Sequence, residues 1–115
     1  MTPARCVLLL ADRRQSQTAA MLRNSGCRLM MTFTPDHAVA LCVNNDIDAV
    51  VLDQEHFVVT ENWSVAQSIK MIKPRICVIL IVHGKIVSEE LPEGIDSIVN
   101  HGDIDSLVKT LKNLL

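Results

Sequence analysis

The sequence has few aromatic residues and few glycines. Only 3% of its 115 residues are aromatic, tyrosine is absent, and four glycines are present. None of these glycines forms the Gly-x-Gly-x-x-Gly turn of a dinucleotide site, and no Gly-x-Ser-x-Gly elbow of a hydrolase occurs. With 49% hydrophobic residues, the core must consist of Val, Ile, Leu, Met and Ala. That composition is typical of a parallel sheet covered by helices.

The chain also lacks a strong charge of either sign. Its net charge is -2 and its pI is near 6.0, which argues against a nucleic-acid surface driven by electrostatic attraction. The longest apolar run, Ile76 to Val82, is far shorter than the roughly 20 residues needed to cross a bilayer. We therefore expect neither nucleic acid nor membrane as a partner of this domain.

The sequence also lacks closely spaced pairs of cysteines. The four cysteines lie in apolar stretches without Cys-x-x-Cys spacing, at Cys6, Cys27, Cys42 and Cys77. This pattern predicts buried free thiols in a reducing cytoplasm. The length suits one compact domain over residues 1–115.

Apolar segments alternate with segments of helical periodicity along the whole chain. The expected strands cover residues 5–11, 28–33, 49–53, 76–82 and 95–99. Helical segments are expected up to Asn24, after Pro35, over 62–73 and over 103–115, with about two turns within 85–91. Parallel neighbours need crossovers that lie on a sheet face, so the alternation predicts an α/β fold with a doubly wound parallel sheet. Five strands fit the flavodoxin-like order 2-1-3-4-5 with a shortened fourth helix. We expect the most hydrophobic strand, 76–82, to be central.

Local signals support the predicted helices. Thr34 and Pro35 are typical of a helix start, Gly26 of the left-handed residue after a helix, and Asp103 of a cap. The expected buried faces consist of Ala19 and Leu22; Ala38, Leu41 and Cys42; Val65, Ala66, Ile69 and Ile72; and Ile104, Leu107, Val108, Leu111 and Leu115.

Two carboxylates follow two of the expected strands. Asp12 follows the first apolar run, and Asp53 ends the third. In the predicted strand order these strands flank the switch point, where ligands of open α/β sheets bind. The two acids are therefore expected to converge at one site, although each could instead mark a strand end or cap a helix.

At these residues the chain resembles the receiver domain of bacterial two-component response regulators. The resemblance rests on the run from Leu8 to Asp12, the run from Val50 to Asp53, and the order of the elements. It implies a cytoplasmic regulatory domain that is not an enzyme, with Asp53 at the phospho-acceptor position. It also implies a weak Mg²⁺ site made by Asp12, Asp53 and the backbone near Glu55.

Several positions depart from the pattern of that family. Ala11 replaces the first acid of the pair, and Val82 falls where the family has a hydroxyl that binds the phosphoryl group. Asn100 replaces a lysine, His101 replaces a proline, and Ser97 replaces an aromatic switch residue. Mg²⁺ prefers several oxygen ligands, so these losses weaken the expected chemistry.

Two further functions remain open. The first is a pseudo-receiver that binds a partner without a phosphoryl group. The second is a metal- or anion-binding domain, because His56, His83 and His101 follow the third, fourth and fifth strands and would lie near the two carboxylates. A histidine close to Asp53 would also make this edge sensitive to pH.

The expected partner is a protein, either a histidine kinase or an output domain. Phe57 and Trp63 lie beside the segment after Asp53 and are the candidates for a partner surface, although Trp63 could equally cover the core. The face of the last helix could also form a homodimer.

Overall fold

The computed structural model describes residues 5–12, 16–53, 59–83 and 93–114, with side chains excepted for 59–63. The elements are β1 (Cys6–Ala11), α1 (Gln17–Asn24), β2 (Arg28–Thr32), α2 (Pro35–Asn44), β3 (Ala49–Asp53), α3 (Val59–Ile72), β4 (Cys77–Val82), β5 (Ser97–Asn100), the 3₁₀ turn η1 (His101–Asp103) and α4 (Ser106–Leu114). The predicted alternation of strands and helices is confirmed. The short helix expected within 85–91 lies outside the described residues.

The sheet has five parallel strands in the order β2-β1-β3-β4-β5, which confirms the predicted flavodoxin-like topology. The central strand is β3, so the expectation of a central β4 is wrong. β4 is nonetheless an interior strand, paired with β3 on one side and β5 on the other. An interior strand covered on both faces needs apolar residues throughout, which explains its hydrophobicity.

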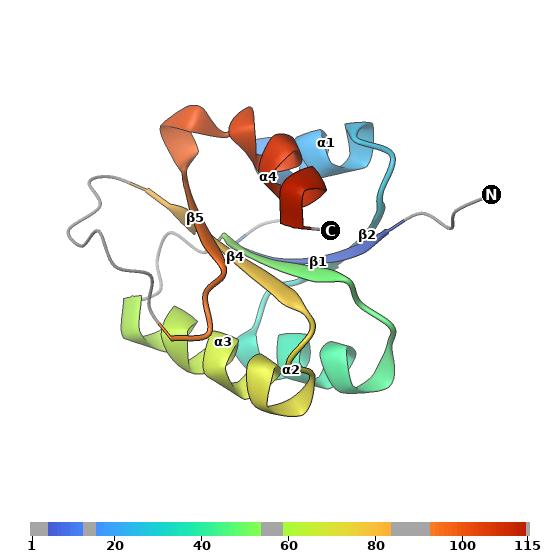
Figure 1. The fold of residues 1–115 in the computed structure, drawn as a ribbon, viewed down its shortest axis with the longest axis vertical. Helices are drawn as coiled ribbons and strands as arrows, with labels where there is room; N and C mark the ends of the chain where they lie inside the picture. The colour runs from blue at the N-terminus through green and yellow to red at the C-terminus, as the bar shows by residue number, and fades with distance from the viewer. Residues whose placement is uncertain (1–4, 13–15, 54–58, 84–92, 115) are drawn as a thin grey trace.

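Helices α1 and α4 cover one face of the sheet, and α2 and α3 cover the other (Figure 1). Side chains along each strand point alternately to the two faces. In β1, Val7 and Leu9 therefore pack with α1 and α4, whereas Leu8 and Leu10 pack with α2 and α3. All four are fully or almost fully buried. Each such side chain contributes about 1.5–3 kcal/mol of hydrophobic stabilisation.

The predicted helix boundaries follow from local hydrogen bonds. The Thr34 hydroxyl accepts from the His37 amide at 3.3 Å ahead of Pro35, and Ser16 caps α1 by accepting from the Ala19 amide at 3.0 Å. Gly26 has a φ of 86°, the left-handed conformation expected after α1. These sequence signals are confirmed.

The last helix begins later than predicted. Asp103 belongs to the 3₁₀ turn and α4 starts at Ser106, so Asp103 is not the cap of an α-helix. The reason is local: the Asn100 side chain accepts from the Gly102 amide at 2.9 Å, and the Ser106 hydroxyl donates to the Asp103 carbonyl at 2.9 Å. These bonds favour a tight turn before the helix.

Most of the side chains predicted on the buried faces of the helices are buried. Leu41 and Val108 are only partly buried, and Leu115 lies outside the described residues. Ile72, expected in the apolar stripe of α3, has 43% of its surface exposed. It lies at the end of the helix and lines an open cleft of about 720 Å³, so no neighbouring side chain among the described residues covers it completely.

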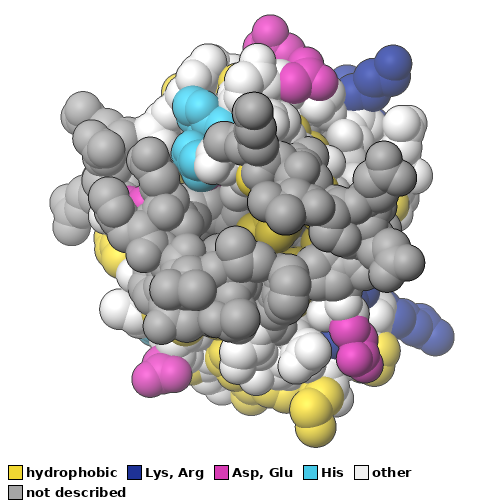
Figure 2. Space-filling model, turned by 90° about the vertical axis from the view of Figure 1, so that its left-hand side faces the viewer, with side chains coloured by type: hydrophobic (Ala, Val, Ile, Leu, Met, Phe, Trp, Pro, Cys, Tyr) yellow, Lys and Arg dark blue, Asp and Glu magenta, His cyan; other side chains and the backbone are white. Residues whose placement is uncertain are grey.

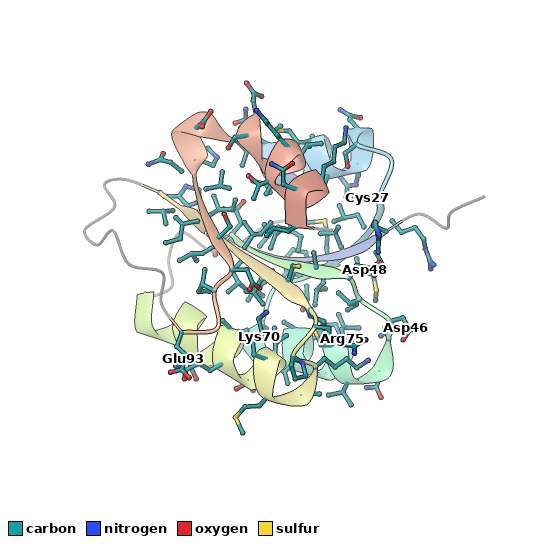
Figure 3. All side chains as sticks on the ribbon, viewed as in Figure 1. Cys27, Asp46, Asp48, Lys70, Arg75 and Glu93 are labelled. Atoms are coloured by element: carbon teal, nitrogen blue, oxygen red, sulfur yellow. The ribbon has the colours of Figure 1, made fainter. Side chains whose placement is uncertain are left out.

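Two aspartates tie the amino ends of neighbouring strands together. Asp48, just before β3, accepts from the Cys6 amide at 2.8 Å, and Asp96, just before β5, accepts from the Val78 amide at 2.7 Å. Asp96 also forms an ion pair with Lys70 of α3 at 2.7 Å. Figure 3 shows Lys70 on α3 and Asp48 near the start of β3.

Both aspartates follow an isoleucine, Ile47 or Ile95, that is itself buried. The repeated Ile-Asp pair thus anchors these strands to their neighbours.

All four cysteines are free thiols, as predicted, but they are not equally buried. Cys6 and Cys42 are buried, whereas Cys27 and Cys77 are partly exposed. Cys6 and Cys27 pack in clusters on opposite faces of the sheet, which does not favour a disulfide between them.

The thiols should therefore react in a defined order. Burial raises the pKa of the Cys42 thiol to about 11, although nearby Lys73 opposes the shift, so at pH 8 only about one thiol in a thousand is ionised. We expect iodoacetamide to label Cys27 first and Cys42 last in the native protein, as measured by peptide mass spectrometry. Equal labelling of the two in the native protein, as after denaturation, would contradict the described packing.

Candidate functional site

Asp12 and Asp53 come to the same edge of the sheet, as predicted. Ala11 at the end of β1 is paired with Asp53 at the end of β3, and Asp12 is the next residue along the chain. The two acids differ in environment, because Asp53 is only 7% exposed whereas Asp12 is exposed. A buried carboxylate requires a hydrogen-bonding or charged partner.

That partner is His83. Its Nε2 lies 2.6 Å from Oδ1 of Asp53, and the imidazole is itself mostly buried. A carboxylate oxygen only accepts when ionised, so Nε2 carries the proton in this contact. A protonated imidazole would make the contact an ion pair. The buried carboxylate of Asp53 therefore already has a hydrogen-bond donor in contact with it.

His101 extends this arrangement to β5. Its ring stacks on that of His83, with centroids 4.4 Å apart and planes inclined by 27°. The two rings meet because Val82 of β4 is paired with Asn100 of β5, and each histidine directly follows one of these residues. Figure 2, which views this edge of the sheet, shows histidine side chains side by side at the surface.

The expectation that His83 lies near the two carboxylates is confirmed for Asp53. The contact to Asp53 is made by His83 rather than by Val82, which packs against the core beside α2 and α3. The alternation of strand side chains explains the difference. Ile79, Ile81, Val51 and Val99 all belong to the cluster on the α1 and α4 face, and Asp53 and His83 continue this alternation. Alternate residues of β4, counted from Ile79, lie on the same face of the sheet as Asp53, and His83 is the residue of that series at the end of the strand.

The remaining candidate residues lie on β5 or outside the described residues. The Asn100 oxygen accepts from the Gly102 amide, and Ser97 is a half-buried residue at the start of β5. His56, Glu55 and Phe57 lie outside the described residues, as does the side chain of Trp63.

The residues that the structure describes do not form a site for a divalent cation by themselves, and Glu55, one of the expected ligands, lies outside them. No group of three or more His, Cys, Asp and Glu side chains in these segments could hold a metal ion. Ala11, where the family resemblance implies the first acid of the pair, presents only a methyl group and is 1% exposed. Mg²⁺ needs near-octahedral oxygen ligands, and Oδ1 of Asp53 is already engaged by a nitrogen donor.

Comparison with known proteins gives matches at the level of structure. No protein-family model matches the sequence, and no curated protein matches it significantly. The response regulator TrrA of Thermotoga maritima, solved with Mg²⁺-BeF, has a TM-score of 0.79 and 21% identity over 96% of this chain and 99% of its own. The chain has the fold of a response regulator receiver domain.

Two further structures share this receiver fold. TrrA in complex with the histidine kinase ThkA gives a TM-score of 0.80 with 19% identity over 96% of this chain and 98% of TrrA. A CheY-like receiver domain from Methanospirillum hungatei gives 0.76 with 12% identity, over 97% of each chain. None of the helices in the described segments is long and apolar enough to span a membrane.

The contact between His83 and Asp53 should give an interaction energy between the two residues in the free energy of unfolding. Replacing His83 by alanine leaves a buried carboxylate without this donor, which should lower the free energy of unfolding by about 1–3 kcal/mol. The same substitution in an Asp53→Asn background should cost at least about 0.5 kcal/mol less. Urea unfolding of the four proteins in this double-mutant cycle measures both values. Strictly additive effects would show that the two side chains do not interact.

Proposed function

We propose that this chain is a receiver-like regulatory module that acts by binding a protein partner and does not require a phosphoryl group on Asp53. The observation that carries the proposal is the 2.6 Å contact of His83 with the Asp53 carboxylate. This corresponds to a pseudo-receiver within two-component signalling.

Phosphoryl transfer to an aspartate needs a free carboxylate oxygen and charges that neutralise the incoming group. Here Oδ1 of Asp53 is hydrogen-bonded to the imidazole of His83, and the carboxylate is buried. Ala11 offers no ligand for a cation, and the side-chain oxygen of Asn100 is hydrogen-bonded within its own turn. Each of these features raises the barrier to phosphorylation of Asp53 by the route that the resemblance implies.

The same features stabilise a single state of the carboxyl edge. His83 supplies a donor to the buried acid, and His101 holds the His83 ring by stacking. Because β3, β4 and β5 are adjacent in the sheet, this arrangement joins the ends of three neighbouring strands. A receiver fold stabilised in this way can present a constant surface to a partner.

The class of partner follows from proteins of this fold. TrrA is described in complex with a histidine kinase, so a kinase or an output domain is the partner that we propose. The segment containing Phe57 and Trp63 and the outer face of α4 are the candidate contact surfaces, the latter including self-association.

Beryllofluoride, which mimics an acyl phosphate on aspartate, provides the decisive test. We expect the two-dimensional amide NMR spectrum of the wild-type chain to stay unchanged on addition of Mg²⁺ and beryllofluoride, because His83 competes for the carboxylate. His83→Thr, which removes the imidazole and supplies a hydroxyl, should respond at least weakly around Asp12 and Asp53.

The control is His83→Thr combined with Asp53→Asn, which should not respond. Wild-type shifts that centre on Asp53 and vanish in Asp53→Asn would overturn the proposal and make the chain a phosphorylatable receiver. A partner, once identified, should bind wild type and Asp53→Asn with the same Kd.

A further inference from the structure

A second candidate site lies at the amino edge of the sheet, on the side opposite to Asp53. It is a cavity of about 310 Å³ bounded by the start of β1, the turn between α1 and β2, and the second half of α4. Figure 3 shows Cys27, one of its lining residues, where the chain passes from α1 to β2. None of the residues that surround Asp53 and His83 lines this cavity.

The walls of the cavity are apolar and come from elements that are well packed. Val7 is 1% exposed and Leu111 is 6% exposed, and both belong to the core cluster beneath α1 and α4. Val108, one turn before Leu111 on α4, is half-buried and faces the same space. This apolar part of the lining favours a ligand with an apolar body.

The size of the cavity limits the ligand. Its volume is at the lower end of the range typical of small-molecule pockets, about 300–1,000 Å³. At about 30 Å³ for each heavy atom, it accommodates roughly ten heavy atoms. A peptide helix, with a diameter of about 10–12 Å, is too large, whereas a short acyl chain or a single aromatic ring fits.

Two cationic side chains, Arg5 and Lys112, also line the cavity. Lys112 is exposed and has no hydrogen-bond or ion-pair partner within the described segments. Arg5 lies 3.7 Å from Asp48, but its side chain is 54% exposed, so this surface pair is weak and can rearrange. The charges at this cavity therefore favour an anion.

The carboxyl end of α1 lies beside the cavity and repels an anion only weakly. Carbonyl groups at the end of a helix carry partial negative charge, which repels anions. The Leu22 carbonyl, however, already accepts from the Ser25 hydroxyl at 2.6 Å and from the Cys27 thiol at 3.0 Å. The full positive charges of Arg5 and Lys112 therefore outweigh the partial negative charge at the end of α1, which these hydrogen bonds reduce.

We propose that this cavity binds a small amphipathic carboxylate, such as a short-chain or medium-chain acyl carboxylate. Its apolar body packs against Val7, Val108 and Leu111, and its carboxylate lies near Lys112 and Arg5. The binding site is independent of the Asp53 edge, so it does not rest on the function proposed above.

Octanoate, with ten heavy atoms, is the probe for this site. In an amide NMR titration of the wild-type chain, it should produce saturable shifts at Ser25, Gly26 and Leu111. Octylammonium, which has the same chain and the opposite charge, should produce much weaker ones. Octanoate should also slow the alkylation of Cys27 by iodoacetamide. Absence of saturable shifts, or equal responses to the two probes, would overturn the proposal.

Two variants and a matched control test the residues. Lys112→Gln should weaken octanoate binding about threefold to fivefold, the range expected for loss of one exposed charge contact. Lys109→Gln, on the same helix at an exposed position that does not line the cavity, should leave the Kd unchanged. Val108→Phe should fill the cavity and abolish binding. Equal Kd values for the two lysine variants would count against the site even if Val108→Phe failed to fold.

Discussion

A parallel sheet that is covered by helices on both faces must bury the side chains of its inner strands, and this constraint governs the whole chain. β1 and β3 consist almost entirely of aliphatic residues because neither strand has a face in contact with water. Polar residues are displaced to the two edges of the sheet. Asp48 and Asp96 bond to backbone amides at the amino edge, and Asp53 with its histidine partner lies at the carboxyl edge. The chemistry of the domain is therefore confined to these edges.

The carboxyl edge combines the strand arrangement of the receiver fold with side chains that differ from those the family resemblance implies. The sheet still brings the ends of β1 and β3 together, as in any sheet of this order. The side chain beside Asp53 is the imidazole of His83, which donates to the carboxylate and stacks on the ring of His101. A nitrogen donor satisfies a buried carboxylate without a cation, and this is the physical basis of the phosphorylation-independent role that we propose.

Much of the fold was predictable because its signals are local. Continuous apolar runs identified the strands and a period of 3.6 residues identified the helices. Thr34, Pro35 and Gly26 marked helix ends through hydrogen bonds and backbone angles within a few residues. The errors also have local causes. The start of α4 was misplaced because the Asn100 side chain, not Asp103, organises the turn before it, and Ile72 was assigned to the core because periodicity cannot reveal an open cleft beside a helix end.

The sequence by itself determined which segments form strands and which form helices, because these signals depend only on spacing along the chain. With the common five-stranded order, it also predicted that Asp12 and Asp53 arrive at the same end of the sheet. Only the tertiary structure decided that His83, 30 positions from Asp53, contacts it, and that His101 stacks on His83. The cavity beside Lys112 also emerged only from the fold. The sequence placed these histidines near the carboxylates, but which of them makes contact depends on the register of β3, β4 and β5, and the cavity depends on how α4 packs.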